Sequence, residues 1–357
     1  MATANSPERA LKAILPLIEA GQAYEAHQKA RTFASRYVKA SQFDTAIQVL
    51  FQSARELLKA GHLGSGTDLG LFLIDVYNTK EQAVDEESRG RLTQLIALTG
   101  PSGTWRKTLI DKSVAWSSTL GWCPSGDPDL QHYIGELLYK EGAFDLAEPH
   151  LLAAGERDSA RLLATIMFEW SRGGAEPGAY ASRGVIPYLI LTNILAARTF
   201  LAQFLSHLQI ARPALFTQPS APLTIGDTAD EIYPTTDPTL NFLQLAIRTC
   251  QRGNGRTAEH QRDARNAWVR LCGRYVSRGA GAVGSQAMKE AAAALGKEYF
   301  GIQPARSQVN PLQEMMSSFF GGGAPAPAAL PSTPRIAGGG RGRGRLGAAP
   351  GSPSALD

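Results

Sequence analysis

Gly21-Gln-Ala-Tyr24-Glu-Ala-His27 is a short phrase that recurs in the first half of the chain, as Ser41-Gln-Phe43-Asp-Thr-Ala46 and as Gly142-Ala-Phe144-Asp-Leu-Ala147. Each copy has an aromatic residue just after a small or polar turn residue and a small or compact side chain three residues later. This pattern is typical of one helix ending and the next packing closely against it. Because such a unit cannot bury its apolar face alone, the repeats predict an all-α fold, a TPR-like α-solenoid of stacked helical pairs, and solenoids of this kind mostly bind other proteins.

Apolar residues recur at helical spacing along most of the chain. Leu11, Ile14, Leu15 and Ile18 follow three- and four-residue steps and form one apolar stripe. Trp116 falls on a similar stripe, and we expect it in the core. The same periodicity predicts helices at about 7–20, 24–39, 43–60, 67–79, 86–99, 104–120, 128–141, 144–154 and 157–172. A second helical block follows at about 177–209, and further helices at about 238–252, 256–276 and 282–300.

The glycine run Gly61-His-Leu-Gly64-Ser-Gly66-Thr67 separates two of these helices. It lacks the following lysine and the preceding strand that a phosphate-binding loop needs. We therefore expect a helix connection here, with Ser65 or Thr67 as the N-cap of the next helix.

The helical periodicity of apolar residues is absent between Pro213 and Pro238, a stretch that contains five prolines. Within it, Leu223-Thr-Ile225 and Glu231-Ile-Tyr233 have the composition of short strands, which predicts a small β-hairpin. A loop of this length in a compact array is usually functional or disordered.

The C-terminal part of the sequence contains one more predicted helix and then a segment rich in Gly, Ala, Pro and Ser. Apolar residues at helical spacing predict one last helix with a fully apolar face, which either caps the solenoid or presents a groove to a partner helix; they are Leu312, Met315, Met316, Phe319 and Phe320. Beyond Gly321 the composition is mostly Gly, Ala, Pro and Ser. Such a segment buries too little surface to offset its ordering entropy, so we expect a disordered tail over 321–357.

Length and charge point to an interaction protein rather than a nucleic-acid module. At 357 residues and 43% hydrophobic, the chain exceeds the size at which one compact core keeps growing, which favours an elongated array or two subdomains. The tail from Gly321 carries four arginines against one acid, so it holds most of the net charge of +4. The remaining body is nearly neutral, whereas a nucleic-acid module would have clustered basic charge.

Several features predict a cytosolic location. Cys123, Cys250 and Cys272 are too few and too scattered for a disulfide framework, which indicates a reducing compartment. Charged residues interrupt the N-terminal apolar positions, which excludes the h-region of a signal peptide. The most apolar stretch, 185–197, is too short to span a bilayer, so we expect no direct membrane insertion.

No catalytic or metal-binding set is recognisable. The histidines are dispersed, and none has a second ligand at the helical spacing typical of zinc sites; they are His27, His62, His132, His150, His207 and His260. We therefore expect no cofactor and no enzymatic activity.

Charged residues do gather on two predicted helices near the N-terminus. Glu25, His27, Gln28, Arg31 and Arg36 share one helix, and Asp68 and Asp75 share a later one. Such a mixed-charge surface suits specific docking of a partner. The alternative is an ordinary solvated face, which physical reasoning alone favours.

A family resemblance favours the docking surface over the ordinary solvated face. Tyr24-Glu-Ala-His-Gln28 is followed by Arg31-Thr32 and Arg36-Tyr37, then by Ser65-Gly-Thr-Asp-Leu69, Ala115-Trp-Ser-Ser118 and Tyr299-Phe-Gly-Ile302. In this order, from about residue 8 to residue 320, these motifs resemble the Golgi-to-ER traffic protein 4 family, the scaffold of tail-anchored protein targeting. The resemblance implies that charged N-terminal helices dock a targeting ATPase. Glu25, His27, Gln28, Arg31, Arg36 and Asp68 lie in matching motifs, whereas Asp75 does not.

The resemblance also implies a second partner. Related scaffolds place a hairpin beside the site of a ubiquitin-like adaptor, which brings a TPR co-chaperone indirectly. The candidate adaptor contacts are therefore the apolar residues of the 213–238 segment, namely Leu223, Ile225, Ile232 and Tyr233.

The expected organisation has four parts: a flexible N-terminus (1–6), an ATPase-docking half (7–155), an adaptor-binding half (156–320) and the tail (321–357). The rival interpretation is a helical-repeat scaffold subunit of another complex, of the proteasome-lid or signalosome kind. Such a subunit would normally end in a winged-helix module, whereas this chain is expected to end in a helix and a tail.

Overall fold

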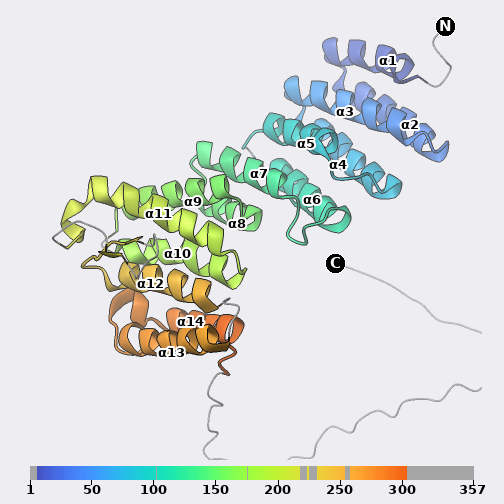
Figure 1. Ribbon diagram of the computed structural model, residues 1–357. Helices are drawn as coiled ribbons and strands as arrows, with labels where there is room; N and C mark the ends of the chain where they lie inside the picture. The colour runs from blue at the N-terminus through green and yellow to red at the C-terminus, as the bar shows by residue number, and fades with distance from the viewer. Residues whose placement is uncertain are drawn as a thin grey trace, which may run out of the picture. The chain divides into compact units, whose positions relative to one another are not determined.

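The computed structural model describes residues 6–101, 103–174, 176–217, 223–224, 231–253 and 258–303, and this part of the chain is almost entirely helical (Figure 1). It belongs to one compact unit, Met1–Pro304. The α-helices are α1 (Pro7–Glu19), α2 (Ala23–Lys39), α3 (Phe43–Lys59), α4 (Leu63–Lys80), α5 (Glu86–Thr99), α6 (Trp105–Leu120), α7 (Pro128–Lys140), α8 (Phe144–Ala154), α9 (Arg157–Ser171), α10 (Pro177–Ile190), α11 (Ile194–Ala211), α12 (Pro238–Gly253), α13 (Ala258–Tyr275) and α14 (Gln286–Phe300). Two 3₁₀ turns, η1 (Pro213–Leu215) and η2 (Gly281–Gly284), and two strands, β1 (Leu223–Thr224) and β2 (Glu231–Ile232), complete the described elements.

The helices stack as antiparallel neighbours in two layers. Each helix packs against the next one in the chain, and most also pack against the next but one, as α1 does with α3 and α2 with α4. The odd-numbered helices from α1 to α11 form one continuous layer by these contacts. This is the helical-pair solenoid that the sequence predicts. The predicted helix at 312–320 and the predicted tail lie outside the described residues.

One short helix connection occurs five times in the described chain, each time with the next helix beginning two residues after the left-handed residue. The same backbone geometry also occurs at Glu81, but there the next helix, α5, begins only at Glu86. In each of the five connections, a residue in the left-handed conformation follows the end of one helix. These residues are Gly21, Ser41, Gly61, Gly142 and Thr192. The residue after it donates its N–H to a carbonyl five positions earlier, as Gln22 does to Leu17 and Asn193 to Tyr188. This hydrogen bond is typical of the Schellman motif, which satisfies the free carbonyls at a helix end.

The repeated phrase marks these connections, although its aromatic is not a constant part of them. Phe43 and Phe144 are the first residues of their helices, but in the first copy that position is Ala23. Tyr24 comes one residue later, and its side chain is 74% exposed. The feature that all five connections share is a small buried residue three positions into the new helix, namely Ala26, Ala46, Gly66, Ala147 and Ala197.

One predicted helix start is wrong, and one predicted helical block is resolved into two helices. The helix expected from residue 67 begins at Leu63, so Ser65 and Thr67 lie inside α4 and neither is its N-cap. A Cβ at Gly66 would lie 2.6 Å from the Leu58 side chain, so the glycine run permits close packing of α4 on α3. The block expected at 177–209 is two helices, α10 and α11, joined by the connection at Thr192.

The core runs along the whole described array and consists mainly of aliphatic side chains with aromatic clusters. Trp116 is 1% exposed, and its ring centroid lies 5.1 Å from that of Tyr77, which confirms the predicted core position. Among the described helices, none is both long and apolar enough to cross a membrane.

The predicted hairpin is present between α11 and α12. β1 and β2 pair in antiparallel fashion, with Leu223 opposite Ile232, and Phe216 forms a further bridge with Thr235. The segment 225–230, including Ile225 of the predicted adaptor contacts, lies outside the described residues.

Candidate functional site

Three of the seven predicted ATPase-docking residues form one cluster between α2 and α4. His27 Nε2 lies 2.7 Å from Asp68 Oδ2, and Arg31 donates a hydrogen bond to the same carboxylate oxygen. The Arg31 guanidinium also lies over the Phe72 ring, 5.5 Å from its centroid. The spacing of His27 and Arg31 on one helix places both side chains on the face that meets α4.

The cluster keeps the Asp68 carboxylate ionised. Burial works to raise the pKa of Asp68, but the hydrogen bonds from His27 and Arg31 outweigh it, and the pKa lies below its ordinary value. The Asp68 side chain is nevertheless 42% exposed, so a partner can also reach this carboxylate.

The other four predicted docking residues stay separate from the cluster. Glu25, Gln28, Arg36 and Asp75 are exposed, and none makes an ion pair with another described residue. Asp75 lies two turns beyond Asp68 on the same face of α4. These groups are therefore open to a charged partner, and helical spacing places Glu25 and Arg36 on the opposite side of α2 from His27.

Two aromatic residues belong to this surface and were not among the predicted ones. Tyr24 precedes Gln28 by one turn and Arg31 by two, so its exposed ring lies on the same face of α2. Phe72 lies under Arg31 on α4. The spacing of Tyr24 from the charged residues was visible in the sequence, but the repeat pattern assigned that aromatic to the turn.

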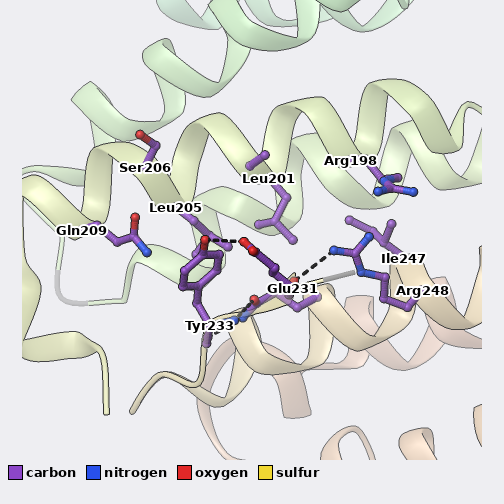
Figure 2. A pocket seen from close by; sticks show the side chains of 11 residues that line it. Arg198, Leu201, Leu205, Ser206, Gln209, Glu231, Tyr233, Ile247 and Arg248 are labelled. Carbon is purple, nitrogen blue, oxygen red and sulfur yellow. Dashed lines mark hydrogen bonds between the residues drawn. The ribbon is translucent and has the colours of Figure 1, made fainter. Parts of the chain in front are cut away.

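A second candidate surface is a groove of about 380 Å³ between α11, the hairpin and α12. Figure 2 shows Glu231 and Tyr233 of the hairpin segment facing the side chains of α11. The lining combines apolar and polar groups, namely Arg198, Leu201, Ala202, Leu205, Ser206, Gln209, Glu231, Tyr233, Gln244, Ile247 and Arg248. Apolar side chains with a few polar groups are typical of a peptide-binding groove.

The four predicted adaptor contacts have different environments. Tyr233 lines the groove, and its hydroxyl donates a hydrogen bond to Glu231 Oε2 at 2.8 Å. That bond to a carboxylate, with burial, raises the pKa of Tyr233. Leu223 is exposed on β1 outside the groove lining, and Ile232 is 8% exposed and does not line the groove. Ile225 lies outside the described residues.

Two amide side chains of α12 hold the hairpin segment in place. Gln244 hydrogen bonds to both the N–H and the carbonyl of Tyr233, and Asn241 does the same for Thr235. These amides supply the backbone hydrogen bonds of Tyr233 and Thr235, whereas Pro234 and Thr236 bond to the segment 215–217. The spacing of Asn241 and Gln244, three residues apart on a predicted helix, was visible in the sequence but not recognised as a site.

The described residues contain no group of three or more His, Cys, Asp or Glu side chains that could hold a metal ion. Burial raises the pKa of Cys250 to about 12 and that of Cys272 to about 11. Both thiols are therefore protonated at neutral pH and poor nucleophiles.

Comparison with known proteins gives one consistent match. The family model described as GET4, Golgi to ER traffic protein 4, matches residues 40–320. Golgi to ER traffic protein 4 of Schizosaccharomyces pombe is 30% identical over 304 residues, which cover 84% of this chain and 91% of the relative. The Aspergillus fumigatus protein of the same name is 31% identical over 321 residues, or 86% of this chain and 87% of the relative.

A solved structure agrees with these matches. The crystal structure of C. therm. Get4 superposes with a TM-score of 0.74 at 31% identity, covering 92% of this chain and 99% of that chain. These matches favour the family resemblance over the rival assignment to a lid-type or signalosome-like subunit.

Proposed function

The chain belongs to the Golgi to ER traffic protein 4 family, and from this membership we propose that it is a cytosolic, non-enzymatic scaffold for the targeting of tail-anchored membrane proteins. Its N-terminal half (7–155) binds the targeting ATPase, and its C-terminal half (156–320) binds a ubiquitin-like adaptor. The adaptor in turn carries a TPR co-chaperone with the substrate.

The His27, Arg31 and Asp68 cluster is the observation that supports the ATPase site most directly. It fixes the Asp68 carboxylate, the His27 imidazole and the Arg31 guanidinium on two helices that pack together, and Glu25 and Arg36 are exposed on the same helix as His27. Preformed charge geometry lowers the entropic cost of docking and selects a partner with the complementary pattern. The exposed ring of Tyr24 supplies apolar contact area next to the charges.

The groove beside the hairpin is the proposed adaptor site. It combines the apolar floor of Leu201, Leu205 and Ile247 with the polar groups of Glu231 and Tyr233. An extended or helical N-terminal segment of the adaptor fits a groove of this composition. The amides of Asn241 and Gln244 fix the hairpin wall, so the site is formed before the adaptor arrives.

Holding both partners on one scaffold raises the effective concentration of the substrate-bearing co-chaperone near the ATPase. A scaffold that also binds one nucleotide state of the ATPase more tightly shifts the ATPase toward that state. Both effects require only binding and no catalysis by the scaffold.

The test is reconstitution of the three-part assembly from purified proteins. The full chain, the ATPase and the adaptor of the same organism are mixed in pairs and all together, and complexes are sized by chromatography with light scattering. We expect two binary complexes and one ternary complex, with no direct complex of ATPase and adaptor. Failure of the chain to bind either partner would overturn the proposal.

A further inference from the structure

The helix α13 carries an unusual concentration of arginine. Between residues 252 and 278 the sequence has seven arginines, two acids and no lysine, whereas the rest of the chain before the tail has 25 basic and 29 acidic residues. Five of these arginines are exposed on or just after α13, and together with Val269 we call them the α13 arginine surface; they are Arg262, Arg265, Arg270, Arg274 and Arg278.

These arginines have no acidic partner among the described residues. No ion pair or side-chain hydrogen bond is formed by any of the five. Some arginines elsewhere on the protein are paired, as Arg161 is with Asp158 and Arg183 with Glu148, whereas exposed arginines such as Arg9 and Arg157 make no ion pair with a described residue. Like charges that lie close together repel one another and destabilise the folded state. A partner that carries the opposite charge would offset this repulsion.

The surface has an apolar centre. Helical periodicity places Val269 between Arg265 on one side and Arg270 with Arg274 on the other. Val269 is 55% exposed, although α13 buries Trp268 and Leu271 against its neighbours. Gly273, one turn after Val269, has open space where a Cβ would be, so the centre is a shallow strip.

The apolar strip of Val269 and Gly273, with arginines on both sides, indicates which class of ligand the surface binds. Single-stranded RNA binding uses exposed aromatic rings for stacking, but Trp268 is 2% exposed and stacks on Phe300 instead. Binding to a membrane surface uses several large apolar side chains, and Val269 is the one exposed large apolar residue of α13, a helix that the structure describes throughout. Guanidinium groups on both sides of an apolar strip match carboxylates on both sides of a partner's apolar strip.

We propose that the α13 arginine surface binds an acidic amphipathic helix of a partner protein. Small apolar side chains of that helix contact Val269 and Gly273, and its carboxylates pair with Arg265 on one flank and with Arg270 and Arg274 on the other. Arg262 lies in line with Val269, two turns earlier, and pairs with a carboxylate at the end of the strip. Arg262 and Arg274 are twelve residues apart, or about 18 Å along the helix, so the contact covers about three turns. This surface is separate from the two docking surfaces proposed above.

The experiment uses the full chain and a synthetic helical probe about four turns long, with alanine and leucine on one face and glutamate on both flanks. Binding is measured by fluorescence anisotropy at physiological salt. The test variant is Arg262→Gln with Arg270→Gln and Arg274→Gln, which removes charge but keeps helix propensity. The matched control is Arg9→Gln with Arg157→Gln and Arg172→Gln, three exposed arginines outside α13.

We expect the test variant to bind the probe about tenfold or more weakly than the control variant. Replacing Val269 with Asp is expected to weaken binding as well. A salt titration of the unaltered chain gives a second test that needs no variant, because charge pairing weakens as salt is raised.

Three outcomes would overturn the proposal. The first is equal binding of the probe by the test and control variants, and the second is no binding by the unaltered chain. The third is tighter binding of phosphatidylserine vesicles or of an RNA duplex through the same arginines, which would assign the surface to a membrane or to a nucleic acid.

Discussion

The side-chain amide of Gln244 makes two hydrogen bonds with the backbone of Tyr233: its oxygen accepts from the N–H at 2.8 Å, and its nitrogen donates to the carbonyl at 2.9 Å. Gln244 is 5% exposed, so neither bond is easily replaced by water. One side chain of α12 thus fixes the position of a residue that lines the candidate adaptor groove.

Replacing Gln244 with Ala is therefore expected to destabilise the hairpin region by about 1–3 kcal/mol, because two backbone groups lose their partners. Urea denaturation of the variant checks this, and adaptor binding should fall with it. The control is Gln94→Ala, since Gln94 is exposed and makes no side-chain hydrogen bond with another described residue. Equal stability of both variants would contradict the assigned role.

Tyr233 itself is expected to contribute to adaptor affinity. Tyr233→Ala removes a ring from the groove lining and should weaken adaptor binding by about 2 kcal/mol or more, as buried aromatic anchors usually do. Leu223→Ala is the control, because Leu223 lies outside the lining, and ATPase binding should persist in both variants. Calorimetry with each partner distinguishes a local loss from unfolding, which would abolish both interactions.

Charge reversal on α2 is expected to disrupt ATPase capture. Arg31→Glu with Arg36→Glu places like charge next to Asp68 and removes two cations from the surface, so affinity should fall by about tenfold or more. Helical circular dichroism should stay unchanged because both side chains are exposed. An unaltered affinity in a pull-down with purified ATPase would remove this surface from the proposal, and Arg157→Glu serves as the matched control.

Asp68 is expected to give stability that depends on pH. Its pKa is lowered in the folded protein, so its contribution is complete above the unfolded pKa of about 3.9 and is lost as the pH falls through the lowered folded pKa. Because the group is 42% exposed, the effect should stay below about 1 kcal/mol.

The measurement compares Asp68→Asn with the unaltered chain in urea at pH 7 and near pH 3. The stability gap at pH 7 should shrink at the lower pH. Asp75→Asn, which removes a carboxylate without an ion-pair partner among the described residues, should show no gap at either pH. A gap for Asp68→Asn that does not change with pH would contradict the charge explanation.

The segment from Gly321 onward is expected to be dispensable for both partner interactions. Its composition offers few apolar anchors, and its arginines supply little attraction at physiological salt. A chain that ends at Phe320 should keep its melting temperature and both affinities. Loss of either partner on truncation would instead place part of a binding site in that segment.

The sequence predicted most helices because their connections carry a visible signal. Gly142 with Phe144 marks a helix end and the next helix start, and the structure has both at these positions. Thr192 adopts the same left-handed conformation with φ 59°, which a β-branched residue rarely does. No local preference of Thr192 indicates a helix end there, so the periodicity predicts one block where the structure has α10 and α11.

The candidate sites were less predictable than the fold, since they depend on contacts between distant residues. The pairing of His27 with Asp68 requires that α2 and α4 lie side by side, which follows from the solenoid once its register is known. The double hydrogen bonds of Asn241 and Gln244 depend on where the hairpin segment crosses α12. Spacing on one helix cannot reveal that crossing.

Asp237 connects two parts of the chain that are far apart in sequence. One of its carboxylate oxygens accepts hydrogen bonds from Thr239 and Leu240 at the start of α12, and the other accepts from Gly178 at the start of α10. Asp237 directly follows the hairpin segment, so its carboxylate links that segment to α10, in addition to the packing of α10 on α12. Engagement of a ligand at the hairpin should therefore slow amide hydrogen exchange in the first turn of α10, a helix that does not line the groove.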